Sequence, residues 1–117
     1  MEKAIETLNL KHEGLNVLIN AYYEMESIEG DFDFGDESEN ADYLARFKSG
    51  ELIAVCIVVS IFDKSGNLEG TDSLGMCHIN SSDVLNEVQE IVKDNAMVET
   101  AFDDLKTVIS LVKLLND

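Results

Sequence analysis

The sequence predicts a single α+β domain over residues 1–117, in which an antiparallel sheet of about four strands carries a short helix and a long C-terminal helix or helix pair. Three observations predict this class. Apolar residues alternate with polar ones, or run continuously, in two stretches that contain glycine turns, residues 7–25 and 52–79. The segment 82–116 holds neither Gly nor Pro and repeats apolar residues every three or four positions, as helices do. Apolar residues make up 45% of the chain, enough for a core.

Residues 7–25, TLNLKHEGLNVLINAYYEM, are interpreted as a β-hairpin that turns at the tripeptide HEG. After the turn, apolar side chains alternate at Leu15, Val17, Ile19, Ala21, Tyr23 and Met25. The same stretch read as a helix would place Asn16, Asn20 and Glu24 on one polar face. We favour the hairpin, because Gly14 weakens a helix and because Val, Ile and Tyr are typical of strands.

An acidic loop is expected at residues 28–42, IEGDFDFGDESENAD, which hold seven carboxylates and no base. Phe32 and Phe34 alternate with the acids, and two aromatic rings in a polar loop call for burial in the core or in a partner. A loop held by these rings would present fixed carboxylates, which lose little entropy when they meet a row of Lys and Arg. We therefore take as candidate partner-binding residues Asp31, Asp33, Asp36, Glu37, Glu39 and Asp42.

A calcium loop is the alternative for this stretch. Five of its acids match ligand positions of the EF-hand register: Asp31, Asp33, Glu37, Glu39 and Asp42. The match fails at the place where the turn needs glycine, because the sequence has Asp36 there and Gly35 comes one place early. The last ligand is the short Asp42 in place of Glu. We therefore expect no specific metal site.

The next elements are a short helix and the clearest strand of the chain. Asn40 is the expected N-cap of a helix that ends at Ser49-Gly50. The strand is LIAVCIVVSIF, residues 52–62, which is apolar on both alternations. Such a strand is typical of the centre of a sheet that is covered on both faces.

A second hairpin is expected to complete the sheet. The tight turn DKSGN, residues 63–67, leads into residues 68–79, LEGTDSLGMCHI, as the partner of the apolar strand. Gly70 and Gly75 are candidates for β-bulges, because glycine inside a strand often marks one.

The C-terminal segment 82–116 carries a heptad pattern after an N-cap supplied by Ser81-Ser82-Asp83. Its seam positions are spaced 4-3-4-3: Val84, Val88, Ile91, Asn95, Val98, Phe102, Leu105, Ile109 and Val112. One continuous helix would be about 50 Å long, and its distal seam would then form a homodimer through Val98, Phe102, Leu105, Ile109 and Val112. Asn95 would fix the register of that dimer. The alternative, equally favoured, is a break at residues 94–96 and two helices packed antiparallel.

Charge sets the expected partners. The chain has 24 acids and 8 bases, a formal net charge of −16, so it should repel nucleic acid and anionic membranes and attract basic protein surfaces. On the C-terminal segment, Glu87, Glu90 and Asp94 share one helix face and extend the acidic surface. The N-terminus has no apolar signal-peptide core, which predicts a cytoplasmic protein with Cys56 and Cys77 as reduced thiols.

No residue pattern indicates catalysis. Cys77 and His78 are adjacent on a predicted strand and so point to opposite faces. The only other imidazole is His12, and Arg46 is the only arginine that could bind a phosphate. The sequence also lacks a phosphate-binding glycine loop and a G-x-S-x-G elbow. We expect no catalytic residue, no metal and no cofactor.

Two stretches carry a resemblance: DFDFGDESENADYLARFKSGEL at residues 31–52 and GTDSLGMCHI at residues 70–79. Over residues 31–94 the chain resembles small acidic proteins encoded by phages and other mobile elements. In those proteins a similar short helix leads into a strand, a DSLxG segment and a C-terminal helix. The resemblance implies a phage-type protein made inside a bacterium, and it assigns no site residue.

These observations favour a non-catalytic acidic binding protein. Its expected role is to inhibit a bacterial nucleic-acid-handling defence protein, in the manner of anti-CRISPR or anti-restriction proteins that imitate DNA. The expected partner is the basic surface of that host protein, because duplex DNA carries about one charge per 1.7 Å of axis and its readers match it. The alternative is an assembly module that forms a homodimer through its C-terminal helix. A more distant alternative is a divalent-cation-dependent enzyme.

Overall fold

The computed structural model of the chain describes residues 3–24 and 37–116. Several residues of the predicted acidic loop lie outside the described residues: Asp31, Phe32, Asp33, Phe34 and Asp36. The predicted loop is wrong from residue 37 on, because a helix begins at Glu37, so that Asn40 lies inside the helix and is not its N-cap. The backbone of Glu37 and Glu39 lies in the first turn of this helix, and Asp42 is exposed on it. An ordered acidic surface on this loop therefore stays a prediction.

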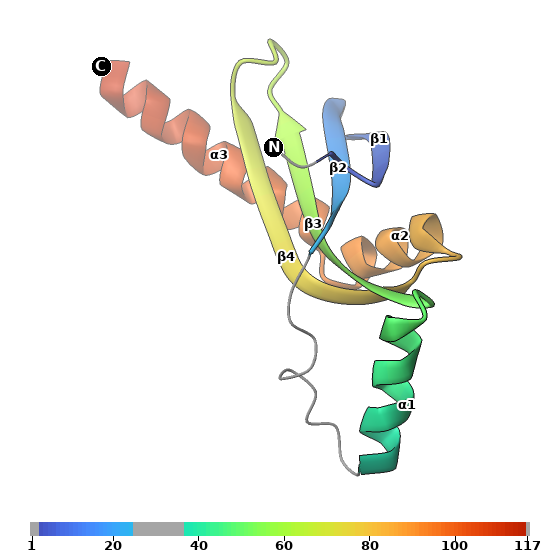
Figure 1. Cartoon of the computed structure of the whole chain (residues 1–117). Coiled ribbons are helices and arrows are strands. Elements are labelled where there is room, and N and C mark those ends of the chain that lie inside the picture. Colours follow the sequence, from blue (N-terminus) through green and yellow to red (C-terminus); the bar gives the residue numbers. More distant parts are fainter. Residues whose placement is uncertain (1–2, 25–36, 117) are drawn as a thin grey trace.

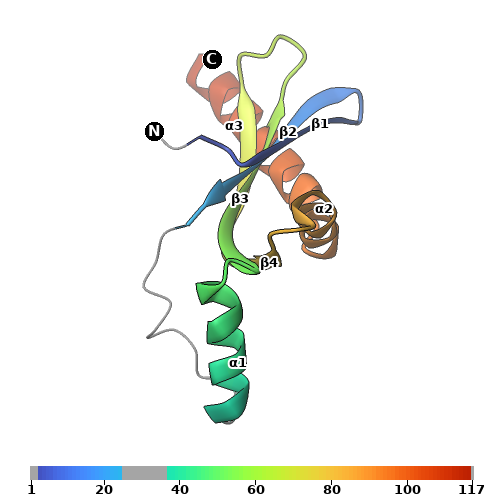
Figure 2. The ribbon, with the colours of Figure 1, turned by 45° about the vertical axis from the view of Figure 1, so that its right-hand side comes forward.

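The fold is the predicted α+β arrangement, a four-stranded antiparallel sheet with helices on one face and at one end (Figure 1). The strands follow chain order across the sheet: β1 (Glu6–His12), β2 (Leu15–Tyr23), β3 (Leu52–Phe62) and β4 (Glu69–Asn80). The helices are α1 (Glu37–Lys48), α2 (Val84–Asp94) and α3 (Met97–Asn116). α2 and α3 cover one face, and α1 stands beyond the end of the sheet where β3 begins (Figure 2).

The N-terminal hairpin is confirmed. Its turn has two central residues, Glu13 and Gly14, with φ of 53° and 78°. A type I′ turn requires this left-handed pair, and its twist matches that of the two strands. The residues of β2 that this register buries in the core are Val17, Ile19 and Ala21.

β3 is an interior strand, as predicted, but its two faces are covered unequally. The face toward α2 and α3 is buried along its length, through Ile53, Val55, Ile57, Val59 and Ile61. On the other face Leu52 and Ala54 are buried against Phe47 of α1. Cys56 and Val58, farther along that face, are only half-buried. The prediction of full cover on both faces is wrong beyond Ala54, because α1 packs only at the start of the strand.

A bulge interrupts β4 at the second of its two glycines. The register between β3 and β4 shifts between Val55 and Ile57, where Gly75 and Met76 oppose a single residue of β3. Met76 has a φ of 55°, in the left-handed region. The predicted bulge at Gly75 is confirmed.

Gly70 has a different role in β4. It pairs in register with Ile61, so the predicted bulge at this position is wrong. A Cβ there would lie 2.2 Å from the Ala101 carbonyl oxygen and 2.3 Å from the Leu105 nitrogen. The glycine therefore lets the backbone of α3 contact the sheet, the other common reason for glycine in a strand.

The C-terminal segment breaks into two helices at residues 95–96, which confirms the break of the second predicted alternative and excludes the single continuous helix. Asn95 ends α2, because its backbone N–H and its side-chain Nδ2 both donate to the Ile91 carbonyl, at 3.1 and 2.8 Å. Ala96 then takes a left-handed conformation with φ of 50°. This residue turns the chain between α2 and α3.

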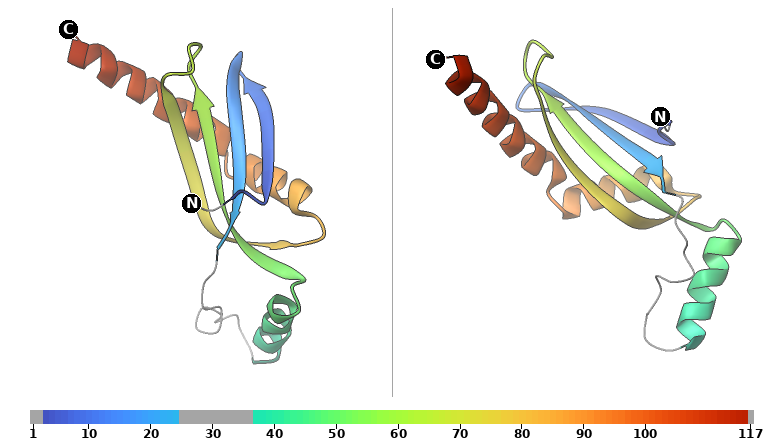
Figure 3. Two further views of the ribbon diagram at one scale, coloured as in Figure 1. Left: turned by 45° about the horizontal axis from the view of Figure 1, so that its top comes forward. Right: turned by 60° about the vertical axis from the view of Figure 1, so that its left-hand side comes forward.

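The direction of α3 differs from the predicted antiparallel pair. α3 leaves the end of α2, crosses the sheet and passes the edge strand β4, rather than folding back along α2 (Figure 1 and Figure 3). Both helices lay their apolar sides on the sheet, through Val88, Val92, Met97, Ala101 and Leu105. The predicted antiparallel packing is wrong, because the sheet and not the neighbouring helix covers the apolar side of α3.

Candidate functional site

The outward sides of α2 and α3 carry a row of exposed carboxylates. On α2 the buried valines face the sheet, and Glu90 and Asp94 point away from it. On α3 Asp103 also points away from the sheet, and Glu99 is exposed at the rim of a pocket between the helices and β1. We give the name acidic row to five exposed residues, Asp83, Glu90, Asp94, Glu99 and Asp103.

The acidic row has regular spacing on a rigid support. Within each helix its members are four residues apart, about 6 Å along the axis: Glu90 and Asp94 on α2, and Glu99 and Asp103 on α3. The fully buried side chains of Val88, Met97 and Leu105 hold both helices against the sheet. Carboxylates on such a support are fixed in position before a partner arrives, so less entropy is lost on binding.

Two lysines lie in or beside the acidic row: Lys93, which lines a surface hollow with Asp83 and Glu90, and Lys106. Of its members, all of which the structure describes, only Asp103 forms an ion pair, with Lys106 at 3.7 Å. Both side chains are mostly exposed, and an exposed pair of this kind contributes little to stability. Asp83 accepts a hydrogen bond from the neutral Nδ2 of Asn86 at 2.9 Å. The row therefore keeps most of its negative charge available to a basic surface.

Glu87 shares the predicted helix face with Glu90 and Asp94 but turns toward the sheet. Its two carboxylate oxygens accept from the backbone N–H and from the side-chain Nδ2 of Asn80, the latter at 3.0 Å. Asn80 Oδ1 in turn accepts from Arg46 at 3.1 Å, which joins α1, β4 and α2 in one network. Glu87 is therefore half-buried and engaged within the chain, whereas Glu90 and Asp94 are exposed.

Two further carboxylates accept backbone N–H groups of β4. Asp104 Oδ2 accepts from Thr71 N, and Glu24 Oε2 accepts from Met76 N, each at 2.9 Å. We name Glu24, Glu87 and Asp104 the β4-bound carboxylates. β4 is an edge strand, and backbone N–H groups that already have an acceptor no longer template another strand. Sequence reasoning missed these contacts, because they join residues 7 to 52 positions apart.

The predicted dimer seam packs mainly on the protein's own sheet. Four of its five members lie in the core or against it, Val98, Phe102, Leu105 and Ile109. The fifth, Val112, is half-buried. The large apolar residues that α3 exposes are different ones, Leu111, Leu114 and Leu115. The heptad spacing correctly predicts that this segment is helical, but it does not show which side of α3 packs on the sheet.

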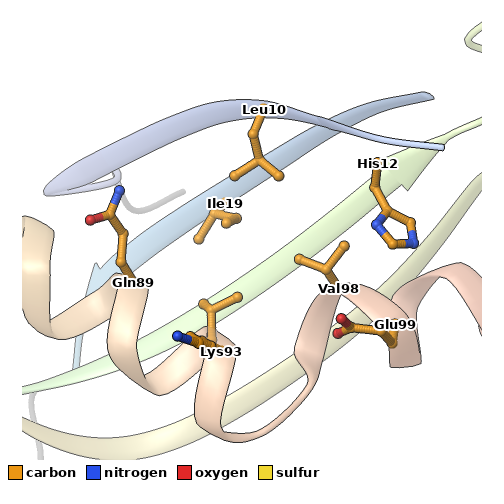
Figure 4. A pocket seen from close by; sticks show the side chains of 8 residues that line it. Leu10, His12, Ile19, Gln89, Lys93, Val98 and Glu99 are labelled. Atoms are coloured by element: carbon orange, nitrogen blue, oxygen red, sulfur yellow. The ribbon is translucent and has the colours of Figure 1, made fainter. Parts of the chain in front are cut away.

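A small pocket opens between β1 and the junction of α2 with α3 (Figure 4). Its volume is about 260 Å³, below the roughly 300–1,000 Å³ of most ligand sites. It is lined by Leu10, His12, Ile19, Gln89, Val92, Lys93, Val98 and Glu99. Beside it the His12 ring meets the Phe102 ring edge-on at 5.1 Å, which packs β1 against α3. A pocket with apolar walls and polar groups at its rim is more typical of a gap between packed elements than of a catalytic site.

The corner between α1 and β4 is held by aromatic and polar contacts that the sequence did not indicate. Tyr43 Oη lies 3.1 Å from His78 Nδ1, and the Phe47 ring meets the His78 ring edge-on at 4.9 Å. Burial raises the pKa of the Tyr43 hydroxyl, the Arg46 guanidinium opposes this rise, and Glu87 adds to it. The polar contact between Tyr43 and His78, with the Phe47 ring packed on the same imidazole, fixes α1 to the sheet.

The two cysteines are free thiols in an environment that keeps them protonated. Burial raises the pKa of both, and the Glu24 carboxylate adds to the rise at Cys56. Cys77 Sγ donates to the Leu74 carbonyl at 3.5 Å, while His78 Nδ1 contacts Tyr43. A thiol with a raised pKa is a poor nucleophile. The part of the chain that the structure describes also contains no group of three or more side chains that could hold a metal ion.

Comparisons with protein families, with curated proteins and with solved structures each find no match for this chain. The resemblance to phage-type proteins therefore stays a prediction, and the functional argument rests on the fold and its surface. Among the described helices, none is long and apolar enough to cross a membrane.

Proposed function

We propose that the protein is a non-catalytic binding protein whose acidic row engages the basic surface of a nucleic-acid-binding protein and so inhibits it. The observation that carries the proposal is the row itself, four exposed carboxylates on two helices fixed to a sheet and a fifth, Asp83, directly before α2, with one ion pair among them. The net charge of −16 adds long-range attraction to a basic partner.

Proteins that bind nucleic acid are the partners that this surface fits best. Duplex DNA presents about one charge per 1.7 Å of axis, and its readers expose matching Lys and Arg. A rigid acidic surface can occupy such a channel in place of DNA, while the same charge opposes direct binding to nucleic acid. In the setting that the phage resemblance implies, the partner is a host defence protein of the CRISPR or restriction type.

The predicted acidic loop is a second contact area in this proposal. Its candidate residues are Asp31, Asp33, Asp36, Glu37, Glu39 and Asp42. Asp42 is exposed on α1, which precedes β3 in the chain, whereas the acidic row follows β4. The two areas can therefore be tested by separate substitutions. Asp33→Lys with Asp36→Lys reports on the loop alone.

The test compares three immobilised proteins in a bacterial lysate: the wild type, Glu90→Lys with Asp94→Lys, and a control with Glu13→Lys and Glu69→Lys. Both double variants change the charge equally at exposed positions, but the control leaves the acidic row intact. Proteins retained at low salt are released stepwise between about 50 and 200 mM salt, over which the Debye length shortens to less than about 10 Å. Retained proteins are identified and assayed for nucleic-acid binding with and without the wild type.

We expect the wild type and the control to retain a nucleic-acid-binding protein that the row variant loses and that salt releases. The wild type should also prevent that protein from binding its nucleic acid. Equal retention by all three proteins, or capture without any effect on nucleic-acid binding, would contradict the proposal.

A further inference from the structure

α3 ends in an apolar surface that the rest of the described chain leaves open. Leu111, Leu114 and Leu115 have relative exposures of 54%, 73% and 84%, the highest among the exposed large hydrophobic residues. α3 passes the edge strand β4 before it reaches them (Figure 1 and Figure 3). The sheet therefore ends before the apolar side of the helix does.

Four residues of this end form one stripe along the helix: Val108, Leu111, Val112 and Leu115. Their spacing of 3-1-3 reads the same in both directions. A two-fold axis between Leu111 and Val112 would set each of these two residues beside its own copy in an antiparallel second helix, and Val108 level with the partner's Leu115. The stripe is thus complementary to itself, as an isologous interface requires.

Charge favours a second copy of this chain at this place. Residues 105–116 contain Lys106 and Lys113 and no acid. The chain's net charge is −16, so all residues outside this stretch together carry −18. Two copies repel each other least where the acids are missing.

The neighbouring edge of the sheet argues for a helix, and not a strand, as the occupant. Asp104 accepts from Thr71 N, and Glu87 accepts from Asn80 N, so backbone donors near both ends of β4 are already bonded. A strand added along β4 would have to displace these carboxylates. A helix meets α3 by side chains alone and leaves them in place.

We infer that the protein forms a two-fold symmetric dimer through the ends of two antiparallel α3 helices. This inference does not rest on the proposed function. The overlap is about three helical turns, smaller than the roughly 800 Å² per partner of a standard interface. We therefore expect weak association, with a dissociation constant in the micromolar range. A dimer of this form carries two acidic rows, which a partner with two basic sites would bind together.

Sedimentation equilibrium from about 1 to 500 µM tests the dimer, a range that brackets a micromolar dissociation constant. Leu111→Glu places a carboxylate in the stripe, and Ser110→Glu places the same charge on the opposite, exposed side of the same turn. We expect the wild type and Ser110→Glu to dimerise, and Leu111→Glu to raise the dissociation constant about tenfold or more, because a buried unpaired charge is costly. A wild type that stays monomeric at the highest concentration, or equal behaviour of the two variants, would overturn the inference.

Cysteine cross-linking tests the orientation. In the antiparallel arrangement Leu111→Cys lies beside its own copy, whereas two copies of Leu115→Cys are about 10 Å apart along the helices, beyond the reach of a disulfide. On mild oxidation we expect a covalent dimer from Leu111→Cys and none from Leu115→Cys or from the wild type, whose Cys56 is half-buried and whose Cys77 is buried. An equally fast covalent dimer from Leu115→Cys would overturn the antiparallel pairing.

Discussion

Two sets of carboxylates lie side by side on α2 and α3 and have different environments. Asp104 accepts from the backbone of β4, while its neighbour Asp103 points outward. One turn apart on α2, Glu87 accepts from Asn80 whereas Glu90 is exposed. The comparison of the β4-bound carboxylates with the acidic row teaches that equal formal charges divide between holding the fold together and facing a partner.

Hydrogen bonding separates the two sets energetically. A carboxylate that accepts a backbone N–H contributes about 1.5–3 kcal/mol in a protected site, and its removal leaves a donor without a partner. An exposed carboxylate contributes little to stability and, in a chain of net charge −16, adds to self-repulsion. We therefore expect the first set to govern unfolding and the second to govern association.

The largest effect should come from the contact between the backbones of α3 and β4 at Gly70, next to the bond between Asp104 and Thr71. In Gly70→Ala the new methyl group meets backbone atoms of Ala101 and Leu105, which no rotamer change can move. We expect the free energy of unfolding in urea to fall by about 3 kcal/mol, the upper part of the usual overpacking range. The control Ser73→Ala, at an exposed position of β4, should stay within about 0.5 kcal/mol of the wild type. Equal stability of both variants would contradict the close contact.

Adjacent residues on α3 give the next effect. Asp104→Ala removes the acceptor of Thr71 N, and Asp103→Ala removes only an exposed ion pair with Lys106. We expect Asp104→Ala to lower the free energy of unfolding by about 1 kcal/mol, because the bond lies near the surface, and Asp103→Ala by less than about 0.5 kcal/mol. Chemical denaturation of both variants in the same buffer measures the difference. A larger loss of stability in Asp103→Ala than in Asp104→Ala would contradict the distinction between the two sets of carboxylates.

Charge reversal within the acidic row should leave the fold intact. Glu90→Lys with Asp94→Lys changes the charge by two units at each position and so moves the net charge from −16 to −12. We expect a change of at most about 0.5 kcal/mol, in the stabilising direction at low salt, because self-repulsion decreases. Thermal unfolding at low and high salt checks this, since screening should remove the gain. A marked loss of stability would show that the row has a structural role.

Asp63 belongs to neither set, because it accepts backbone N–H groups, but only within its own turn. It has the smallest expected effect. The Leu68 N–H holds the pKa of Asp63 below its ordinary 3.8, slight desolvation opposes this, and Ser65 and Asn67 add to it. Because the folded pKa is lower than the unfolded one, the ionised carboxylate stabilises the fold above about pH 4 and loses that effect as the pH falls through the lowered value. Asp63→Ala should therefore have a slightly lower Tm than the wild type at neutral pH and the same Tm near the acid limit. A difference that persists at low pH would exclude the carboxylate as its cause.

The elements could be predicted from the sequence because their signals are local. Gly14 in the HEG tripeptide predicts the first hairpin, and the unbroken apolar run from Leu52 predicts an interior strand. The helix break at Asn95 was only one of two alternatives, since the heptad spacing continues through it. In the structure the left-handed φ of Ala96 ends the continuous helix, and that angle depends on how both helices pack on the sheet.

The roles of individual side chains could not be predicted, because they depend on distant partners. The sequence predicts a bulge at Gly70, but glycine in a strand indicates a bulge and a close approach of another backbone equally well. Asp103 and Asp104 are the same residue type in neighbouring positions, and only Thr71, 33 positions away from Asp104, distinguishes them. The predicted dimer seam does not include the exposed Leu111, because the sequence does not show where the sheet ends.

The comparison of the two sets is tested most directly by the unfolding free energies of Glu87→Ala and Glu90→Ala in urea. These residues are the same type, on the same helix, one turn apart, and only Glu87 accepts from Asn80. We predict that Glu87→Ala loses about 2 kcal/mol because it leaves a part-buried backbone N–H without an acceptor, while Glu90→Ala changes by less than about 0.5 kcal/mol. Equal losses in the two variants, or a larger loss in Glu90→Ala, would contradict the division of the carboxylates into a set that holds the fold and a set that faces a partner.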